Sequence, residues 1–527
     1  MIKRTLDRFS IFTATLGGAT IILASASLAS RVLGLLRDRL LASGFGAGPQ
    51  LDIYYAAFRV PDFIFNILVW GAISAAFIPI FAGYVAKRQQ READNVGSTI
   101  LTLALLVLIV AASVIALFAP RIMPLVAPGF TAQQLDEVVL LTRIMLLSPI
   151  FFGLSGIFGS ILNTYQRFLA YAIAPLIYNI GIIVGALLAP RYGLVWLAIG
   201  VVSGAFLQMV VQLIGVVRTK FRFRPVLKIN HPGVRKIFIL MIPTTIGVAI
   251  LQFNLLIETI IATTLRAGSL SQFMLATSLS MIPVGVVGAS FATAAFPVLA
   301  RAASIRDTDA FLATLLEVIR NILYVVIPAS VAMMLLRAQI VRVAFGSGKF
   351  DFTDTRYVTS LLGILAVSLF AQALIPLLTR AFYSLRNTKT PVIISAACMV
   401  LNIVLALIAS HYLGVVGLAV SFTTASIVQL SLLFFFLSAK VPQLEDQAMI
   451  SAVTKMLLAS LVMGVVIYGS LYGVAFLVEE ISSRYTFAYF FTQLVVGLLL
   501  GAAVYVWLTD RMGLREARAL LRRFRKA

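Results

Sequence analysis

The chain has 527 residues, of which 61% are hydrophobic and only 12% are charged, and its mean hydropathy is +1.02. This composition excludes a water-soluble globular protein and an intrinsically disordered one. The net charge is +22, which we attribute to membrane topology and to contact with anionic lipid headgroups rather than to nucleic-acid binding. The only cysteine, Cys398, cannot form an internal disulfide, and two histidines are too few to favour a histidine-ligated metal site.

Apolar runs long enough to cross a bilayer recur along the whole sequence, without the alternating polarity of barrel strands. The first residues, Met1–Arg8, are basic and no cleavage site follows them, so we expect a retained cytoplasmic segment. The sequence therefore predicts an all-α polytopic membrane protein with about 14 transmembrane helices. The predicted spans are 14–42, 51–86, 96–119, 136–158, 168–189, 193–217, 234–265, 269–300, 310–335, 355–379, 390–410, 414–438, 452–477 and 486–509.

The basic residues outside the spans indicate the orientation of the chain. Most of them fall before the first span, in the even-numbered connections or after the last span, which places both termini in the cytoplasm. The richest connection is a basic loop at 218–233, and a basic tail follows at 510–527. We expect the tail to form a short amphipathic helix on the membrane surface.

A repeat divides the predicted spans into two sets of six. Gly193 opens the sixth span and Gly414 opens the twelfth, and a proline, Pro175 or Pro391, begins the span before each. A repeat with an even number of spans keeps its orientation in the membrane. We therefore predict an N-terminal six-helix lobe at 1–217, a C-terminal six-helix lobe at 234–440 and two additional helices within 441–509. The second and eighth spans are long and contain proline, so bends are expected in both.

Charged residues inside the first two spans are the strongest functional signal. They include Arg31, Arg37, Asp38, Asp52 and Arg59. An ionisable side chain at the bilayer centre costs about 2.5–3.5 kcal/mol, so such groups usually face a watery cavity or each other. The excess of arginine favours an anionic ligand.

The spacing of Arg31 and Arg37 leaves two interpretations open. Six residues of helix rotate a side chain by about 240° net, so the two arginines share a face only if the helix bends, as Gly34 allows. A guanidinium group suits two phosphate oxygens, which favours ligand contact. The alternative is an internal ion pair with Asp38 or Asp52, and we expect these two acids to act as gate or orienting partners.

Several motifs resemble those of the MurJ/MviN family, the lipid II flippases of the multidrug/oligosaccharidyl-lipid/polysaccharide (MOP) exporter superfamily. The motifs lie at 30–38, 45–48, 57–61, 71–79, 127–130, 161–163, 283–288 and 381–384. The resemblance implies two six-helix lobes around a cationic cavity, a lateral portal, and a hydrophobic groove formed partly by the last two helices. It also implies transfer of a polyprenyl-pyrophosphate-linked peptidoglycan precursor, lipid II, from the inner to the outer leaflet of the bacterial cytoplasmic membrane.

The chain departs from the family pattern at several charged positions. Phe65, Asn66 and Trp70 stand where the second span usually carries an Arg-Arg pair and a Glu. Thr277 and Ser278 replace an Asp-Arg pair of the eighth span. Asn66 and Ser278 can still hydrogen-bond a phosphate without a net charge. The predicted substrate-binding residues are therefore Arg31, Arg37, Arg59, Asn66 and Ser278.

Glu258 lies in the apolar run of the seventh span and needs a partner there. The resemblance favours a cation, because some family members hold Na⁺ with an acid at this position and polar residues of later spans, among which Asn402 matches. We expect Glu258 and Asn402 to couple transport to Na⁺ or H⁺, or Glu258 to be a satisfied structural carboxyl. For Arg143 and Arg320, also within spans, we expect pairing with the helical neighbours Glu137 and Glu317.

Two other transport functions stay open at this point. They are export of another lipid-linked oligosaccharide and cation-coupled antiport of small molecules. A cationic cavity argues against cationic drugs, and two additional spans favour a lipid. We expect no enzymatic activity and no bound cofactor or metal, because no nucleophile–base pair, metal-ligand cluster or nucleotide-binding loop is evident in the sequence.

Overall fold

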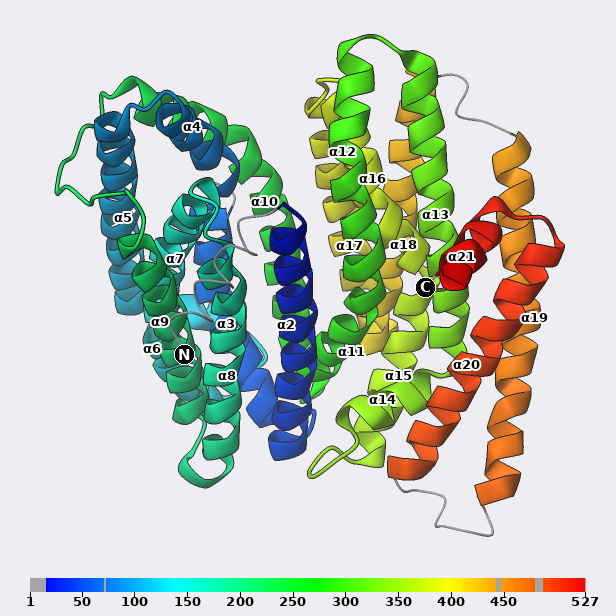
Figure 1. The fold of residues 1–527 in the computed structure, drawn as a ribbon. Helices are drawn as coiled ribbons and strands as arrows, with labels where there is room; N and C mark the ends of the chain where they lie inside the picture. The colour runs from blue at the N-terminus through cyan, green and yellow to red at the C-terminus, as the bar shows by residue number, and fades with distance from the viewer. Residues whose placement is uncertain (1–15, 71–72, 442–446, 479–486, 527) are drawn as a thin grey trace, which may run out of the picture. The chain divides into compact units, whose positions relative to one another are not determined.

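The computed structural model describes residues 16–70, 73–441, 447–478 and 487–526. All regular secondary structure in these ranges is helical, and the chain forms two compact units that divide after Leu270 (Figure 1). The predicted cytoplasmic segment Met1–Arg8 lies outside the described residues.

The first unit contains the helices of the predicted first seven spans. They are α2 (Leu16–Phe45), α3 (Pro49–Phe65), the π-helical segment η1 (Asn66–Trp70), α4 (Ile73–Ala86), α5 (Gln90–Val126), α6 (Ala132–Met145), α7 (Leu147–Thr164), α8 (Phe168–Tyr192), α9 (Val195–Val217) and α10 (Pro232–Thr264). Helix α2 packs on α8, α7 packs on α9, and α10 contacts α3, η1, α4 and α5.

The second unit contains the remaining helices. They are α11 (Ser269–Pro283), the π-helical segment η2 (Val284–Gly288), α12 (Ala289–Ser304), α13 (Thr308–Leu335), α14 (Arg337–Phe345), α15 (Phe352–Val367), α16 (Leu369–Ser384), α17 (Lys389–Leu413), α18 (Val415–Ser438), α19 (Gln447–Val478), α20 (Phe487–Arg511) and α21 (Arg515–Lys526). Helix α13 packs on α19 and α16, and the pairs α17–α18 and α19–α20 lie side by side (Figure 1).

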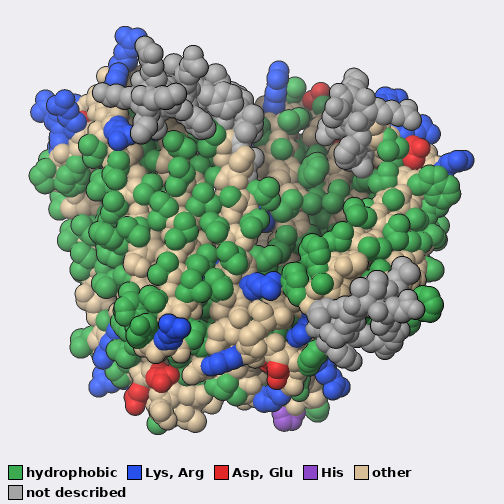
Figure 2. All heavy atoms as spheres, turned by 60° about the horizontal axis from the view of Figure 1, so that its bottom comes forward, with side chains coloured by type: hydrophobic (Ala, Val, Ile, Leu, Met, Phe, Trp, Pro, Cys, Tyr) green, Lys and Arg blue, Asp and Glu red, His purple; other side chains and the backbone are tan. Residues whose placement is uncertain are grey.

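Each predicted span corresponds to one helix or to a run of consecutive helices, while α14 and α21 lie outside the predicted spans. Among the described residues, eleven helices are long and apolar enough to cross a membrane, and the α15–α16 pair, bent by 47°, makes a twelfth. The other two predicted spans correspond to α2 and to the α3–η1–α4 segment, which carry the internal charges. Figure 2 shows hydrophobic side chains over most of the visible flanks, with Lys and Arg mainly at the rims, as a membrane protein requires.

Both long spans, in which bends were predicted, contain a π-helical segment close after their proline. In the second span Pro61 lies inside α3, and η1 begins five residues later at Asn66. In the eighth span η2 begins at Val284, directly after Pro283. Single π-helical segments inside α-helices are uncommon and often mark functional positions. Their occurrence in the second and eighth spans agrees with a six-span repeat.

The turns between spans repeat in the same way. Arg88, Gln166, Arg306 and Arg386 all have φ between 57° and 59°, an uncommon left-handed conformation for residues other than glycine. In each turn the next residue donates its backbone N–H to the carbonyl five positions earlier, which closes the end of the helix. The four turns follow the second, fourth, eighth and tenth spans. Both halves of the sequence therefore use the same turns at equivalent places.

Glycines mark two further equivalent positions. Gly193 and Gly414, with φ of 94° and 59°, end α8 and α17, as the sequence repeat predicted. Gly46 and Gly268, with φ of 68° and 91°, follow the first and seventh spans. The repeat thus begins again at α10. By contacts, however, α10 belongs to the first unit, so the lobe boundary predicted between 217 and 234 follows the repeat and stays a prediction.

Helices α8 and α9 meet along two small-residue motifs, Gly181-x₃-Gly185 and Gly200-x₃-Gly204. A Cβ at Gly181 would lie 2.4 Å from the Cα of Gly204, and a Cβ at Gly200 would lie 2.8 Å from the carbonyl oxygen of Gly181. The obstructing atoms are backbone atoms, which cannot move aside as a flexible side chain can. Close backbone approach through small residues is a common way for membrane helices to associate.

We expect Gly200→Ala to lower the free energy of unfolding by roughly 1–3 kcal/mol, because the added methyl group overpacks the α8–α9 contact. The measurement is the thermal unfolding midpoint of the purified protein in detergent. Gly469→Ala in α19 is the matched control, because a Cβ there meets nothing within 4 Å. Alanine favours a helix over glycine, so the control should not lose stability. Equal midpoints for the Gly200 variant and the unsubstituted protein would contradict the packing argument.

Candidate functional site

A cavity of about 580 Å³ lies inside the first unit. Its wall comes from α2, α3, η1, α4, α7, α8 and α9, so the residues that line it come from across most of this unit. Apolar residues such as Phe65 and Phe152 cover part of the wall, and the ring centroids of these two are 5.0 Å apart. Phe65 is one of the positions where the family resemblance leads one to expect arginine.

Arg31 is the only charged residue among the described residues that line this cavity. Its side chain is exposed rather than enclosed by protein. The other polar lining groups are neutral, namely Ser27, Ser30, Ser155, Ser160, Asn163, Tyr171, Gln208 and Gln212. The described wall therefore carries one positive charge, no negative charge and many neutral hydrogen-bonding groups.

A hydrogen-bond network holds three of the neutral groups in place. The Ser155 hydroxyl of α7 donates to Oε1 of Gln212 at 2.7 Å, and Nε2 of Gln208 donates to the same hydroxyl at 3.0 Å. Gln208 and Gln212 are four residues apart, so they lie on one face of α9. Two amides on one face of a largely apolar helix are a signal in the sequence for these lining groups, which the predicted site lacked.

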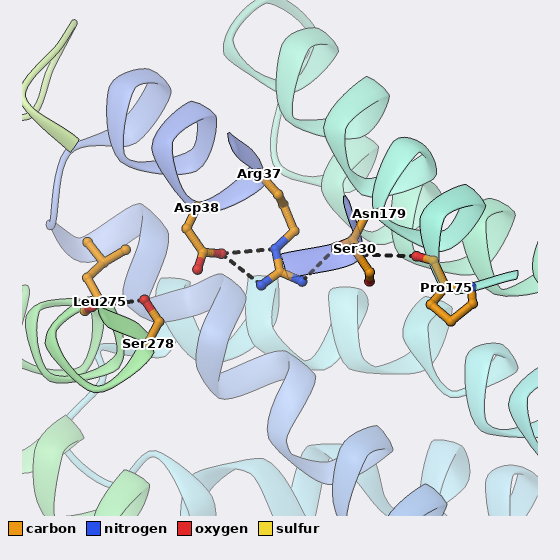
Figure 3. A network of polar contacts seen from close by, with 7 residues as sticks. All are labelled: Ser30, Arg37, Asp38, Pro175, Asn179, Leu275 and Ser278. Carbon is orange, nitrogen blue, oxygen red and sulfur yellow. Dashed lines mark hydrogen bonds and ion pairs between the residues drawn. The ribbon is translucent and has the colours of Figure 1, made fainter. Parts of the chain in front are cut away.

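Arg37 is held beside the cavity by protein partners (Figure 3). Its Nε donates to Oδ1 of Asp38 at 2.9 Å, and its other nitrogens lie 2.8 Å from that oxygen and 3.4 Å from Oδ1 of Asn179. The Asn179 amide donates in turn to Ser30 and to the carbonyl of Pro175, which both line the cavity. Arg37 is not among the lining residues, so in this structure only Arg31 of the two predicted arginines lines the cavity.

Arg59 and Asn66 are also engaged with neighbours inside the first unit. Nε of the buried Arg59 donates to the hydroxyl of Thr259 in α10 at 2.8 Å, and Asp62 lies 4.0 Å from its guanidinium. The Asn66 amide donates to the Asp62 backbone carbonyl and carboxylate, both at 2.9 Å. These contacts tie the start of η1 to the preceding turn of α3.

Two of the predicted acids are deeply buried in this unit. Asp52, in the first turn of α3, is 3% exposed and accepts the backbone N–H of Gly268 at 2.6 Å. Glu258, in α10, is 5% exposed and accepts a hydrogen bond from Asn254 at 2.9 Å. Each carboxylate therefore has a hydrogen-bond donor, as a buried acid requires.

The second unit contains two of the predicted residues. The Ser278 hydroxyl donates to the carbonyl of Leu275 in its own helix at 2.9 Å, and Asn402 is buried in α17. No group of three or more His, Cys, Asp or Glu side chains suited to a metal ion is found in the described part of the chain. The roles predicted for these residues stay predictions.

The structure corrects the partners expected for two other arginines. Arg320 in α13 pairs with Glu516 in α21 at 2.6 Å and not with Glu317, and the Nε of Arg143 donates to the backbone carbonyl of Ala116 at 2.9 Å. A nearby acid on the same helix gains little when another acceptor, such as the buried Glu516 carboxylate or the Ala116 carbonyl, is within reach of the guanidinium. The tail helix α21 is thereby joined to the second unit.

The chain is similar to known proteins over most of its length. A family model described as lipid II flippase MurJ matches residues 41–503. The probable lipid II flippase MurJ of Vibrio cholerae is 33% identical over 79% of this chain and 81% of its own. That of Rickettsia prowazekii is 30% identical over 86% of this chain and 90% of its own.

Solved structures agree with this similarity. A lipid II flippase MurJ in an inward closed conformation has a TM-score of 0.78 at 25% identity, covering 95% of this chain and 100% of that one. A multidrug transporter of the MATE family and MOP superfamily, in an inward-facing conformation, has a TM-score of 0.67 at 17% identity, over 81% of this chain and 99% of its own. The second likeness shows the fold alone. The chain belongs to the MurJ family of lipid II flippases.

Proposed function

We propose that the protein moves a lipid-linked peptidoglycan precursor, lipid II, from the inner to the outer leaflet of the bacterial cytoplasmic membrane. The observation that carries the proposal is the cavity of the first unit, whose described wall has one cation and no anion. A pyrophosphate-linked lipid presents an anionic group between a polar head and an apolar tail. Alternating access would carry that head across the membrane without exposing it to hydrocarbon.

Arg31 is the first contact we assign to the pyrophosphate. Its guanidinium carries planar donors that match phosphate oxygens, and it already faces the cavity. The hydroxyl and amide groups of Ser155, Gln208 and Gln212 suit the neutral sugar and peptide parts of the precursor. A cationic wall disfavours a cationic drug as cargo, which argues against small-molecule antiport.

The remaining predicted contacts require a change of partner. Arg37, Arg59 and Asn66 now donate to groups of the protein, and the Ser278 hydroxyl donates within its helix. We propose that they reach the substrate in another state of the transport cycle, when Asp38 and Asp52 exchange their present partners. In this way the two acids would act as gates.

The apolar tail of the precursor needs a separate surface. An apolar groove of about 240 Å³ lies between α13, α19 and α20 in the second unit, lined by residues such as Ala329, Ile467 and Leu498. We propose that it holds part of the polyprenyl tail. This use accounts for the two helices beyond the repeat.

The orientation and the lipid partners complete the proposal. The excess of Lys and Arg on one side of the spans supports cytoplasmic termini and contact with anionic membrane lipids. For coupling, the buried Glu258 and the buried Asn402 are the proposed cation-responsive groups, with Na⁺ or H⁺ as the ion. Each would exchange its partner when a cation binds.

We predict that Arg31→Ala weakens lipid II binding by roughly tenfold to more than a hundredfold, because a charge-assisted hydrogen bond contributes about 1.5–3 kcal/mol. The measurement is lipid II affinity of the purified protein in nanodiscs. Arg31 is the sharpest test because it forms no ion pair with the described residues, whereas loss of Arg37 would leave the buried Asp38 without its ion-pair partner. Arg191→Ala, an exposed arginine at the end of α8, is the matched control. Unchanged affinity in the Arg31 variant, with correct folding, would remove this residue from the binding site.

We also predict that transport depends on membrane potential or a cation gradient and that Glu258→Gln removes this dependence. One charge that crosses 100 mV gains about 2.3 kcal/mol, which shifts a two-state equilibrium roughly fiftyfold. The measurement is the rate of lipid II transfer in liposomes with and without the gradient. Glu137→Gln, an exposed acid of α6, controls for loss of a carboxylate. A Glu258 variant that still responds to the gradient would exclude this residue from coupling.

A further inference from the structure

The connection between α9 and α10, residues 218–231, crosses the start of α5 as an ordered strap without helix or strand. The backbone of the strap forms hydrogen bonds with side chains of α5, much as a β-strand does with a neighbouring strand. Asp94 accepts the N–H of Arg222 at 3.2 Å, and Ser98 accepts that of Arg224 at 2.9 Å. Thr99 accepts the N–H of Lys228 at 3.2 Å and donates to the Val226 carbonyl. The strap is therefore bound to α5 along its length.

Phe221 anchors the beginning of the strap. Its ring lies against Gly97 of α5, where a Cβ would be 2.6 Å from the ring, and it packs edge-on to Phe81. Any larger residue at position 97 would push the ring outward. This close contact fixes the position of the strap along the axis of α5. The strap is therefore an ordered part of the surface.

The strap closes one side of an apolar pocket of about 610 Å³. This volume lies within the roughly 300–1,000 Å³ range of small-molecule sites. The rest of the wall comes from α5, α7 and α9, including Leu105, Leu154 and Leu213. Thr102 is the only polar residue among those described in the wall, and its hydroxyl donates to the Ser98 carbonyl. The pocket shares no lining residue with the cavity that contains Arg31.

The outer side of the strap is both basic and apolar. Phe223 and Leu227 are 58% and 50% exposed, and the exposed Arg222 and Lys228 lie next to them in sequence. The nearby acids are already engaged, because Glu92 pairs with His231 at 2.8 Å and Asp94 accepts the strap backbone. The strap thus presents net positive charge directly beside a hydrocarbon-lined opening.

The position along the spans points to one kind of occupant. Val217, 73% exposed, ends α9 and also lines the pocket, and the exposed Arg218 follows it. An apolar pocket at the end of a span, with cations at its rim, matches a lipid whose chain lies in the membrane and whose phosphate lies at the interface. A polar metabolite would find only the Thr102 hydroxyl as a hydrogen-bonding partner among the described side chains of the wall.

We infer that this pocket binds one anionic glycerophospholipid, with an acyl chain in the pocket and the phosphate beside Arg222 and Lys228. The bound lipid would join the strap to α5, α7 and α9, in addition to the backbone hydrogen bonds. The pocket is separate from the proposed substrate cavity, so the lipid proposal does not depend on the identity of the transported substrate.

The test measures binding of phosphatidylglycerol and of phosphatidylcholine with identical chains to the full-length protein in detergent, by native mass spectrometry. Phosphatidylglycerol is expected to bind more tightly. Leu105→Trp fills the pocket and should weaken its binding roughly tenfold or more, because loss of about two methylene contacts has that effect. Leu106→Trp, on the adjacent exposed position of the same helix, should have no effect.

The charge of the strap is tested separately by Arg222→Gln combined with Lys228→Gln. Each lost cation near the surface should weaken phosphatidylglycerol binding roughly fivefold, and phosphatidylcholine binding should change little. Both positions are exposed and should tolerate the change, so this arm remains informative if Leu105→Trp fails to fold. Equal binding of the two lipids, or unchanged binding in a folded Leu105→Trp variant, would overturn the proposal. If these variants lost lipid II binding but kept phosphatidylglycerol binding, the proposal would also be overturned and the pocket would belong to the substrate site.

Discussion

The cost of placing charge inside a membrane governs how this chain is arranged. A charged side chain within a span needs water, a ligand or a partner. Arg37 has Asp38 and Asn179, Arg59 has Thr259 and a nearby Asp62, and Glu258 accepts from Asn254. Arg31 instead faces a cavity. Among the described charges of α2 and α3, it is therefore the one best placed for an anionic guest.

The same constraint explains which contacts were predictable. The sequence indicated which residues were charged within spans, but the helical rotation between Arg31 and Arg37 left open whether one cavity would receive both. It could not show that Arg37 would meet Asn179, which is 142 residues away, or that Arg320 would meet Glu516, 196 residues away. Such pairs depend on how helices pack, and packing between distant spans leaves no local spacing in one sequence.

The fold was predictable to a greater extent because its signals are local. Long apolar runs and the glycines at 193 and 414 indicated the spans and the repeat. Pro61 and Pro283 indicated where the second and eighth spans depart from a regular α-helix. The turns at Arg88, Gln166, Arg306 and Arg386 were not predicted, because arginine and glutamine carry no turn signal. The contacts of α10 with the first unit were not predicted either, since the repeat alone would group it with the spans that follow.

The structure shows how the neutral residues at positions expected to be charged affect the cavity. Phe65 lies in the cavity wall, and Asn66 is bonded to Asp62 instead of facing the cavity with a free donor. The wall therefore depends on Arg31 together with hydroxyl and amide groups on α7 and α9. Recognition by one cation and several neutral donors should be less sensitive to salt than recognition by several cations.

The most direct test of this account follows lipid II across the membrane of liposomes that contain the purified protein. The comparison is between lipid II and an analogue in which an uncharged linker replaces the pyrophosphate. If a cationic cavity recognises the anionic group, lipid II should change leaflets much faster than the analogue and than lipid II in protein-free liposomes. Equal transfer of the two lipids, or no transfer above the protein-free rate, would contradict the account.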